Sequence, residues 1–130
     1  MLGRLDLITL VVDDVQLCAA FYREVLGFKP RGKFSNTYAE FENDGVRFNL
    51  IRRAFLPSHT GDDSHSIPRT GQALELAIRL ENADEVKAVY ERAVKLGAAT
   101  ISEPAMTPWG EPTAFIADPD GNVIALFCAE

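Results

Sequence analysis

The chain has 130 residues, a net charge of −6 and an apolar fraction of 47 %, which are typical of one soluble globular domain. Its acidic balance disfavours nucleic acid as a partner, because nucleic acids are bound through basic patches. No apolar run approaches the roughly 18 residues of a membrane span, and the N-terminus lacks the pattern of a secretory signal, so we expect a cytoplasmic protein with no membrane contact.

The first predicted elements are a strand over residues 7–12 and a one-faced helix. In the strand, Ile8, Leu10 and Val12 share the face that packs against the helix. Asp13 and Asp14 are candidate N-caps, and Gly27 supplies the left-handed stop. The helix has apolar residues at helical spacing, namely Cys18, Phe21, Tyr22 and Val25. We therefore expect Cys18, like Cys128, to be a small core residue rather than part of a disulfide.

The rest of the first half is predicted to be β-structure. A weak strand is expected around residues 33–37, and a hairpin is centred on the Asp-Gly pair within 43–46. Both central residues of that turn are expected to take positive φ. A two-residue turn pairs Tyr38 with Ile51 and places Tyr38 on the face opposite the helix.

The segment from about residue 54 to about residue 72 is predicted to be a linker loop without regular structure. It is rich in proline, glycine, serine and aspartate, which favour turns over helices and strands. Its four candidate metal ligands are interpreted as solvated loop residues, namely His59, Asp62, Asp63 and His65.

The second half repeats the first. A strand over 74–80 is followed by a capping box at Asn82 and Glu85 and by an amphipathic helix that ends at Gly97. The next strand is expected near 99–102, or a proline-rich loop over 103–112 replaces it. A second Asp-Gly hairpin then precedes the last strand. The sequence therefore predicts an α+β fold of two β-α-β-β-β repeats, about 5–53 and about 73–130.

This organisation resembles the vicinal oxygen chelate superfamily, which includes glyoxalase I, extradiol dioxygenases and bleomycin-resistance proteins. The resemblance is carried by the paired repeats and by two motifs, Phe21-Tyr22-Arg23-Glu24-Val25-Leu26-Gly27-Phe28 and Asp118-Pro119-Asp120-Gly121-Asn122-Val123-Ile124-Ala125-Leu126-Phe127. It implies a single domain spanning 1–130, with a curled and mostly antiparallel sheet. Two chains commonly pair in such relatives, so it also implies a homodimer.

In the metal-dependent relatives, one ligand comes from the first strand and one from the last strand of each repeat. The resemblance places these four positions at Leu7, Asn49, Glu75 and Ala125. Leucine and alanine offer no lone pair to a cation, and divalent metals at such sites usually take three or more imidazole or carboxylate ligands. We therefore expect no metal and no cofactor.

The strand faces opposite the helices mix apolar with polar side chains, as a pocket for an organic molecule does. Trp109 lies in a proline-flanked loop similar to one that forms the pocket wall in the drug-binding relatives. If Glu75 lies deep in a pocket, it can serve as a base or bind a cation, whereas a structural ion pair with Arg47 or Arg79 is the alternative. The predicted ligand-binding residues are Tyr38, Arg47, Asn49, Glu75, Trp109 and Phe127.

The sequence favours a metal-independent protein that binds a small cationic or aromatic molecule, in a resistance or sequestration role. Acidic and aromatic groups together suit such a ligand. The alternative is a metal-free isomerase, epimerase or lyase of the same superfamily that uses Glu75 as general base.

Overall fold

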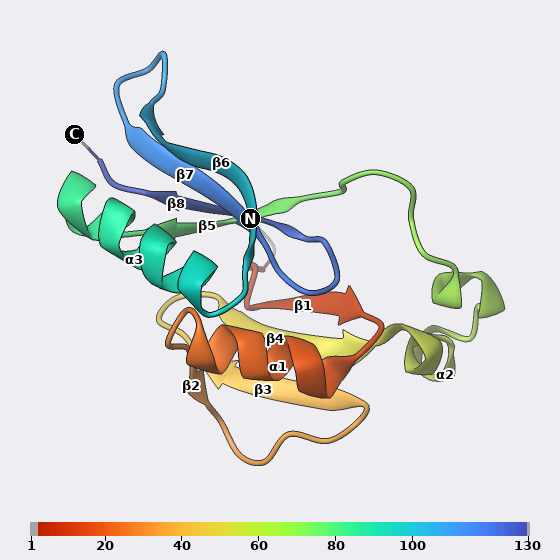
Figure 1. The fold of residues 1–130 in the computed structure, drawn as a ribbon. Helices are drawn as coiled ribbons and strands as arrows, with labels where there is room; N and C mark the ends of the chain where they lie inside the picture. Colours follow the sequence, from red (N-terminus) through yellow and green to blue (C-terminus); the bar gives the residue numbers. More distant parts are fainter. Residues whose placement is uncertain (1–2, 130) are drawn as a thin grey trace. The chain divides into compact units, whose positions relative to one another are not determined.

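A computed structural model describes residues 3–129 (Figure 1). The chain divides into two compact units, residues 1–69 and 70–130, and the boundary lies inside the expected linker. Each unit begins with the order strand, helix and three strands, as the repeat predicts, and short helices follow in the first unit. The α+β fold class is therefore confirmed, and each unit is described by itself below.

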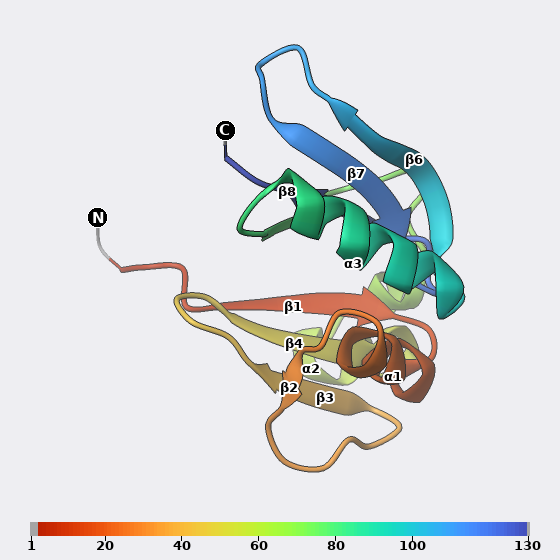
Figure 2. The ribbon, with the colours of Figure 1, turned by 60° about the vertical axis from the view of Figure 1, so that its left-hand side comes forward.

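The first unit is a four-stranded sheet covered by one helix. Its strands have the order β1-β4-β3-β2, in which β1 and β4 are parallel and the other neighbours are antiparallel. Figure 2 shows α1 lying across one face of this sheet. The bounds of these elements are β1 Leu7–Val12, α1 Val15–Glu24, β2 Lys29–Pro30, β3 Tyr38–Glu42 and β4 Arg47–Arg52.

An aromatic core joins α1 to this sheet. The ring of Tyr22 is completely buried and contacts the rings of Phe41 and Phe48 at centroid distances of 6.2 and 5.1 Å. The Asp14 side chain accepts a hydrogen bond from the Leu17 backbone N–H at 3.0 Å, so the expected N-cap is confirmed. Because successive side chains of a strand point to opposite faces of the sheet, the strand residues adjacent in sequence to Phe41 and Phe48 face away from α1.

The second unit repeats this plan with the strand order β5-β8-β7-β6, in which β5 and β8 are parallel. Asn82 caps its helix by accepting from the Glu85 N–H, and the Glu85 carboxylate accepts from the Glu81 N–H. Val86 and Ala93 of the helix are fully buried, and so are Ile124 and Leu126 of the last strand. The bounds are β5 Glu75–Arg79, α3 Ala83–Lys95, β6 Ala99–Met106, β7 Pro112–Ala117 and β8 Val123–Phe127.

The two hairpins form where they were expected, but with different backbone geometry. Tyr38 pairs with Ile51, as a two-residue turn predicts. The expectation of two positive φ angles is wrong, because only Gly45 (φ 85°) takes one in that turn. In the second hairpin Ala117 pairs with Val123, and the Asp118 carboxylate accepts from the Asp120 and Asn122 backbone N–H groups. These side-chain hydrogen bonds hold a longer turn in which Gly121 (φ 89°) takes the left-handed position.

The strand expected around 33–37 is also misplaced, since β2 covers Lys29–Pro30 instead. Residues 35–38 form a turn in which the Ser35 hydroxyl accepts from the Thr37 and Tyr38 N–H groups. The expected strand in the second half is confirmed, because β6 includes 99–102 and continues to Met106.

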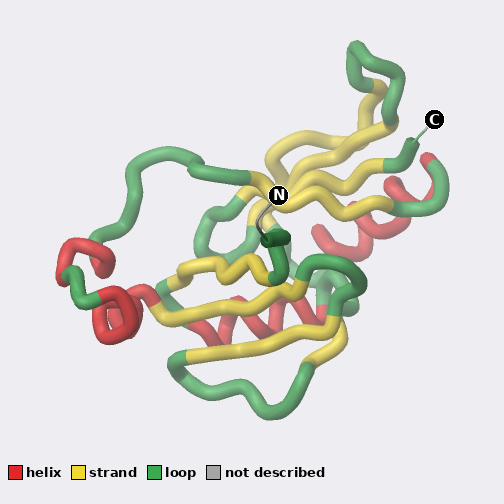
Figure 3. The backbone as a smooth tube through the Cα atoms, turned by 180° about the vertical axis from the view of Figure 1, so that it is seen from behind, coloured by secondary structure: helices red, strands yellow, loops and turns green. Residues whose placement is uncertain are grey.

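The linker is more regular than its composition predicts, so the expectation of an irregular loop over 54–72 is wrong. It contains η1 Arg53–Phe55, α2 Leu56–Thr60 and η2 Asp63–Ser66, and only the part after Ser66 runs as a loop to β5 (Figure 3). Pro57 lies in the first turn of α2, where its missing N–H costs nothing, and Gly61 (φ 77°) ends the helix. Across residues 3–129, no helix is long and apolar enough to span a membrane.

Candidate functional site

A cavity of about 480 Å³ lies in the first unit, on the sheet face opposite α1. This volume is within the usual range for small-molecule sites. The floor of the cavity comes from β1, β3 and β4. Its roof comes from η1 and α2, which follow β4 directly. The lining residues are Thr9, Val11, Tyr38, Ile51, Phe55, Leu56 and His59.

The floor of the cavity has one apolar and one polar row. In the apolar row Val11 of β1 pairs with Ile51 of β4, which pairs with Tyr38 of β3. Two residues back along β4, Asn49 pairs with Thr9. The Tyr38 ring spans the two rows, because its hydroxyl oxygen accepts a hydrogen bond of 2.6 Å from the Asn49 side-chain amide. Polar groups therefore collect at one end of the cavity and aliphatic groups at the other.

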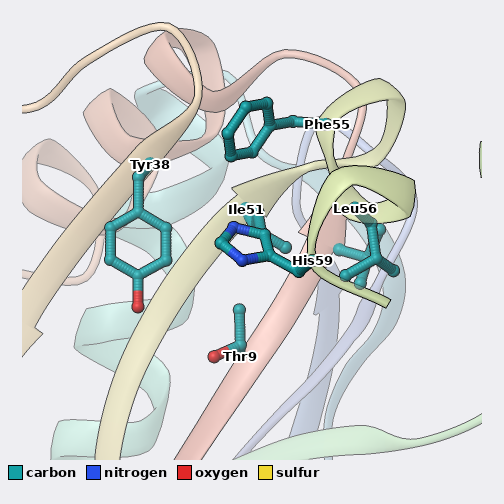
Figure 4. A pocket seen from close by; sticks show the side chains of 7 residues that line it. Thr9, Tyr38, Ile51, Phe55, Leu56 and His59 are labelled. Carbon is teal, nitrogen blue, oxygen red and sulfur yellow. The ribbon is translucent and has the colours of Figure 1, made fainter. Parts of the chain in front are cut away.

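The roof is held in place by Arg53 at the start of η1. Its Nε donates to the Asp13 carboxylate at 2.8 Å, and its Nη2 lies 3.4 Å from the Val11 carbonyl oxygen. In Figure 4 the His59 ring projects from the short helix over the strands, toward Thr9 and Tyr38. The Phe55 ring meets the edge of the His59 ring at a centroid distance of 5.1 Å. The roof is thus an aromatic and aliphatic surface anchored to the end of β1.

Two of the predicted ligand-binding residues meet at this cavity. Tyr38 lines it, and Asn49, which is 3 % exposed, lies behind the Tyr38 hydroxyl. Arg47 does not line it. Its Nη2 donates to the Asp6 carboxylate at 2.8 Å, and it borders a separate polar cavity beside the β3–β4 hairpin.

The other three predicted residues belong to the second unit, and their role in ligand binding stays a prediction. Glu75 is exposed at the start of β5, and it forms no ion pair with another described residue of its unit. Trp109 is 70 % exposed in the β6–β7 turn, where its indole N–H donates to the Glu111 carboxylate at 3.0 Å. Phe127 is half-buried on β8, beside Thr113 and Arg79.

Comparison with known proteins assigns the family. The model of the Glyoxalase/Bleomycin resistance protein/Dioxygenase superfamily matches residues 4–126. The chain belongs to this superfamily. It is also 30 % identical to the uncharacterized protein YwbC of Bacillus subtilis (strain 168), over 98 % of each chain.

Solved structures of the superfamily have the same fold. A glyoxalase/bleomycin resistance protein/dioxygenase family enzyme from Burkholderia phytofirmans PsJN has a TM-score of 0.88 at 18 % identity, covering 98 % of this chain and all of its own. A lactoylglutathione lyase from Agrobacterium tumefaciens has a TM-score of 0.72 at 22 % identity, covering 98 % and 94 %. Both similarities show the fold alone.

The four positions that the resemblance assigns to metal ligands carry residues that do not fit a divalent metal. Leu7 and Ala125 carry no donor atom, and the Asn49 amide donates to Tyr38. Glu75 is then the single carboxylate among the four positions. Within residues 3–129, no group of three or more histidine, cysteine, aspartate or glutamate side chains is arranged to hold a metal ion.

The roof residues Phe55, Leu56 and His59 were not predicted, because the whole linker was interpreted as irregular. The signal for a short helix lay in the positions of individual linker residues rather than in the composition of the linker. Pro57 at a helix start and Gly61 just past its end bracket a single helical turn. In such a turn Phe55 and His59, four positions apart, lie on one side and face the strands.

Proposed function

We propose that this protein binds a small aromatic organic molecule in the cavity of the first unit, and that it does so without a metal at the superfamily's ligand positions. The supporting observation is the cavity itself, which joins apolar walls to a few polar groups under an aromatic roof. Apolar walls give affinity for a flat hydrocarbon body, and a small number of polar groups orient it. The proposal is for binding, because most of the lining side chains are apolar and only Thr9, Tyr38 and His59 bring polar groups to the cavity.

The test is a fluorescence titration with N-phenyl-1-naphthylamine, a neutral dye that brightens in an apolar site. We expect saturable binding to the wild-type protein and a binding-dependent rise in melting temperature. The variant Thr9→Trp places an indole on the cavity floor, and we expect it to weaken dye binding by at least about tenfold, or 1.4 kcal/mol.

The matched control is Ile101→Trp, which adds an indole to the exposed strand β6 of the second unit. It should leave dye binding unchanged. Equal affinity for the wild-type protein and Thr9→Trp, with both proteins folded by circular dichroism, would overturn the proposal.

A further inference from the structure

We infer that the cavity selects molecules that carry a neutral hydrogen-bond acceptor, such as a ketone or amide carbonyl, on a flat apolar body, and that the Tyr38 hydroxyl donates to this acceptor. The inference rests on the proposed function and specifies its ligand class. It follows from the direction of one hydrogen bond, from the division of the cavity floor and from the charges nearby.

The Tyr38 hydroxyl has a donor that the described part of the protein does not use. Its oxygen accepts from the Asn49 side-chain amide at 2.6 Å, so its own hydrogen points elsewhere. Among residues 3–129 this hydroxyl donates to no protein acceptor. A phenol held in place by a buried amide and aimed along a cavity wall is a preorganised donor, and Asn49 is the residue that positions it.

The position of this donor determines where the ligand's polar group lies. The hydroxyl is at the Asn49–Thr9 row of the floor, whereas Val11 and Ile51 form the adjacent aliphatic row. Phe55 and Leu56 close the aliphatic row from above. A ligand with its ring system under this roof and its acceptor toward Asn49 satisfies the hydroxyl and keeps its apolar body out of water.

The Glu40 carboxylate on this face of the sheet favours a neutral acceptor over an anion. Glu40 pairs with Asn49 across the β3–β4 ladder and therefore belongs to the same face, where it is half-buried. Arg47 on the same strand face is already paired with Asp6. A ligand carboxylate beside Tyr38 would be repelled by Glu40. An ammonium group would be attracted by Glu40, but it offers the Tyr38 hydroxyl no acceptor and so leaves that donor unpaired.

A ligand pair that differs by one carbonyl tests the inference: 2-acetylnaphthalene, which has the acceptor, and 2-ethylnaphthalene, which does not. Their affinities for the wild-type protein and for Tyr38→Phe, measured by displacement of N-phenyl-1-naphthylamine, form a double-mutant cycle. We expect Tyr38→Phe to weaken 2-acetylnaphthalene by about three- to tenfold more than 2-ethylnaphthalene, the size of one hydrogen bond. Tyr90→Phe removes a hydroxyl in the second unit that is bonded to Thr100, and it should give no such difference.

Two charged naphthalenes test the electrostatic part. We expect 2-naphthoate and 2-naphthylmethylammonium each to bind the wild-type protein more weakly than 2-acetylnaphthalene. A coupling of less than about twofold, or tightest binding of the ammonium, would overturn the inference, and the ligand comparison on the wild-type protein holds even if Tyr38→Phe fails to fold. Failure of the proposed function looks different, because then Thr9→Trp leaves the affinity of the dye and of every naphthalene unchanged.

Discussion

Replacing Arg53 by alanine tests whether the roof of the cavity is held by a single side chain. The Arg53 guanidinium joins the start of η1 to the end of β1 through Asp13 and the Val11 carbonyl. The segment that follows carries Phe55, Leu56 and His59. Arg53→Ala removes this anchor without changing the identity of any residue that lines the cavity.

The size of the expected effect follows from the solvent exposure of Arg53 and Asp13, which form the ion pair. The Arg53 side chain is 14 % exposed, but the Asp13 side chain is 68 % exposed, so solvent screens the ion pair and its contribution is about 1 kcal/mol or less. The contact with the Val11 carbonyl, at 3.4 Å, is too long to add much. If the ligand binds only when the roof is docked, the binding free energy falls by no more than the free energy that docks the roof. A loss of about 1 kcal/mol or less then weakens the ligand's affinity by about two- to fivefold.

The assay is titration with N-phenyl-1-naphthylamine at low and high salt, with Arg52→Ala as the matched control. Arg52 is the exposed neighbouring residue, and its side chain does not line the cavity. We expect the twofold to fivefold loss for Arg53→Ala only, and a smaller difference from the wild-type protein at about 0.5 M salt, where ion pairs are screened. Equal effects of the two substitutions, or a loss well above tenfold, would refute the anchoring role.

Three further predictions concern the core, Glu75 and the linker. Phe48→Ala removes a ring that is 6 % exposed and packed on Tyr22, and urea unfolding should show a loss of about 3–5 kcal/mol, whereas a loss below about 1 kcal/mol would contradict this packing. Glu75→Gln should leave dye affinity unchanged, because Glu75 lies outside the cavity; turnover of α-substituted carbonyl compounds by the wild-type protein that this variant lost would instead support the isomerase hypothesis. Hydrogen bonds from the Ser64 hydroxyl and backbone N–H lower the pKa of Asp62 from its ordinary value of 3.8. Their stabilisation of η2 is therefore complete above about pH 3.8 and is lost as the pH falls through the lower folded-state pKa, and the Ser64 amide resonance should follow this titration in the wild-type protein but not in Asp62→Asn.

The sequence was most informative where one side chain or one spacing determines the backbone. Asp14 and Asn82 cap their helices as expected, because a short polar side chain before an apolar stripe has few other uses. Alternation along β1 correctly divided the core face from the cavity face. These inferences need only local geometry, so tertiary contacts did not override them.

The sequence was least informative where the prediction rested on the composition of a segment rather than on the positions of its residues. Strand β2 is two residues long and is defined only by its pairing with Phe41 and Glu42, so no periodic pattern marks it. The linker has a loop-like composition, yet Pro57 and Gly61 occupy the positions at which a helix tolerates them. The exposure of Glu75 and Trp109 depends on packing between elements, which a single strand or loop pattern does not contain.

The aromatic core and the proposed binding chemistry depend on the same strand register. Tyr38 faces the cavity because it pairs with Ile51, and this pairing also places Phe41 opposite Phe48 on the α1 side. A slip of one residue along β3 would turn Tyr38 away from the cavity and bring Phe41 out of its contacts with Tyr22. Burial of Phe41 on one face therefore fixes the Tyr38 hydroxyl on the other, so the position of the proposed donor is set by core packing that no ligand touches.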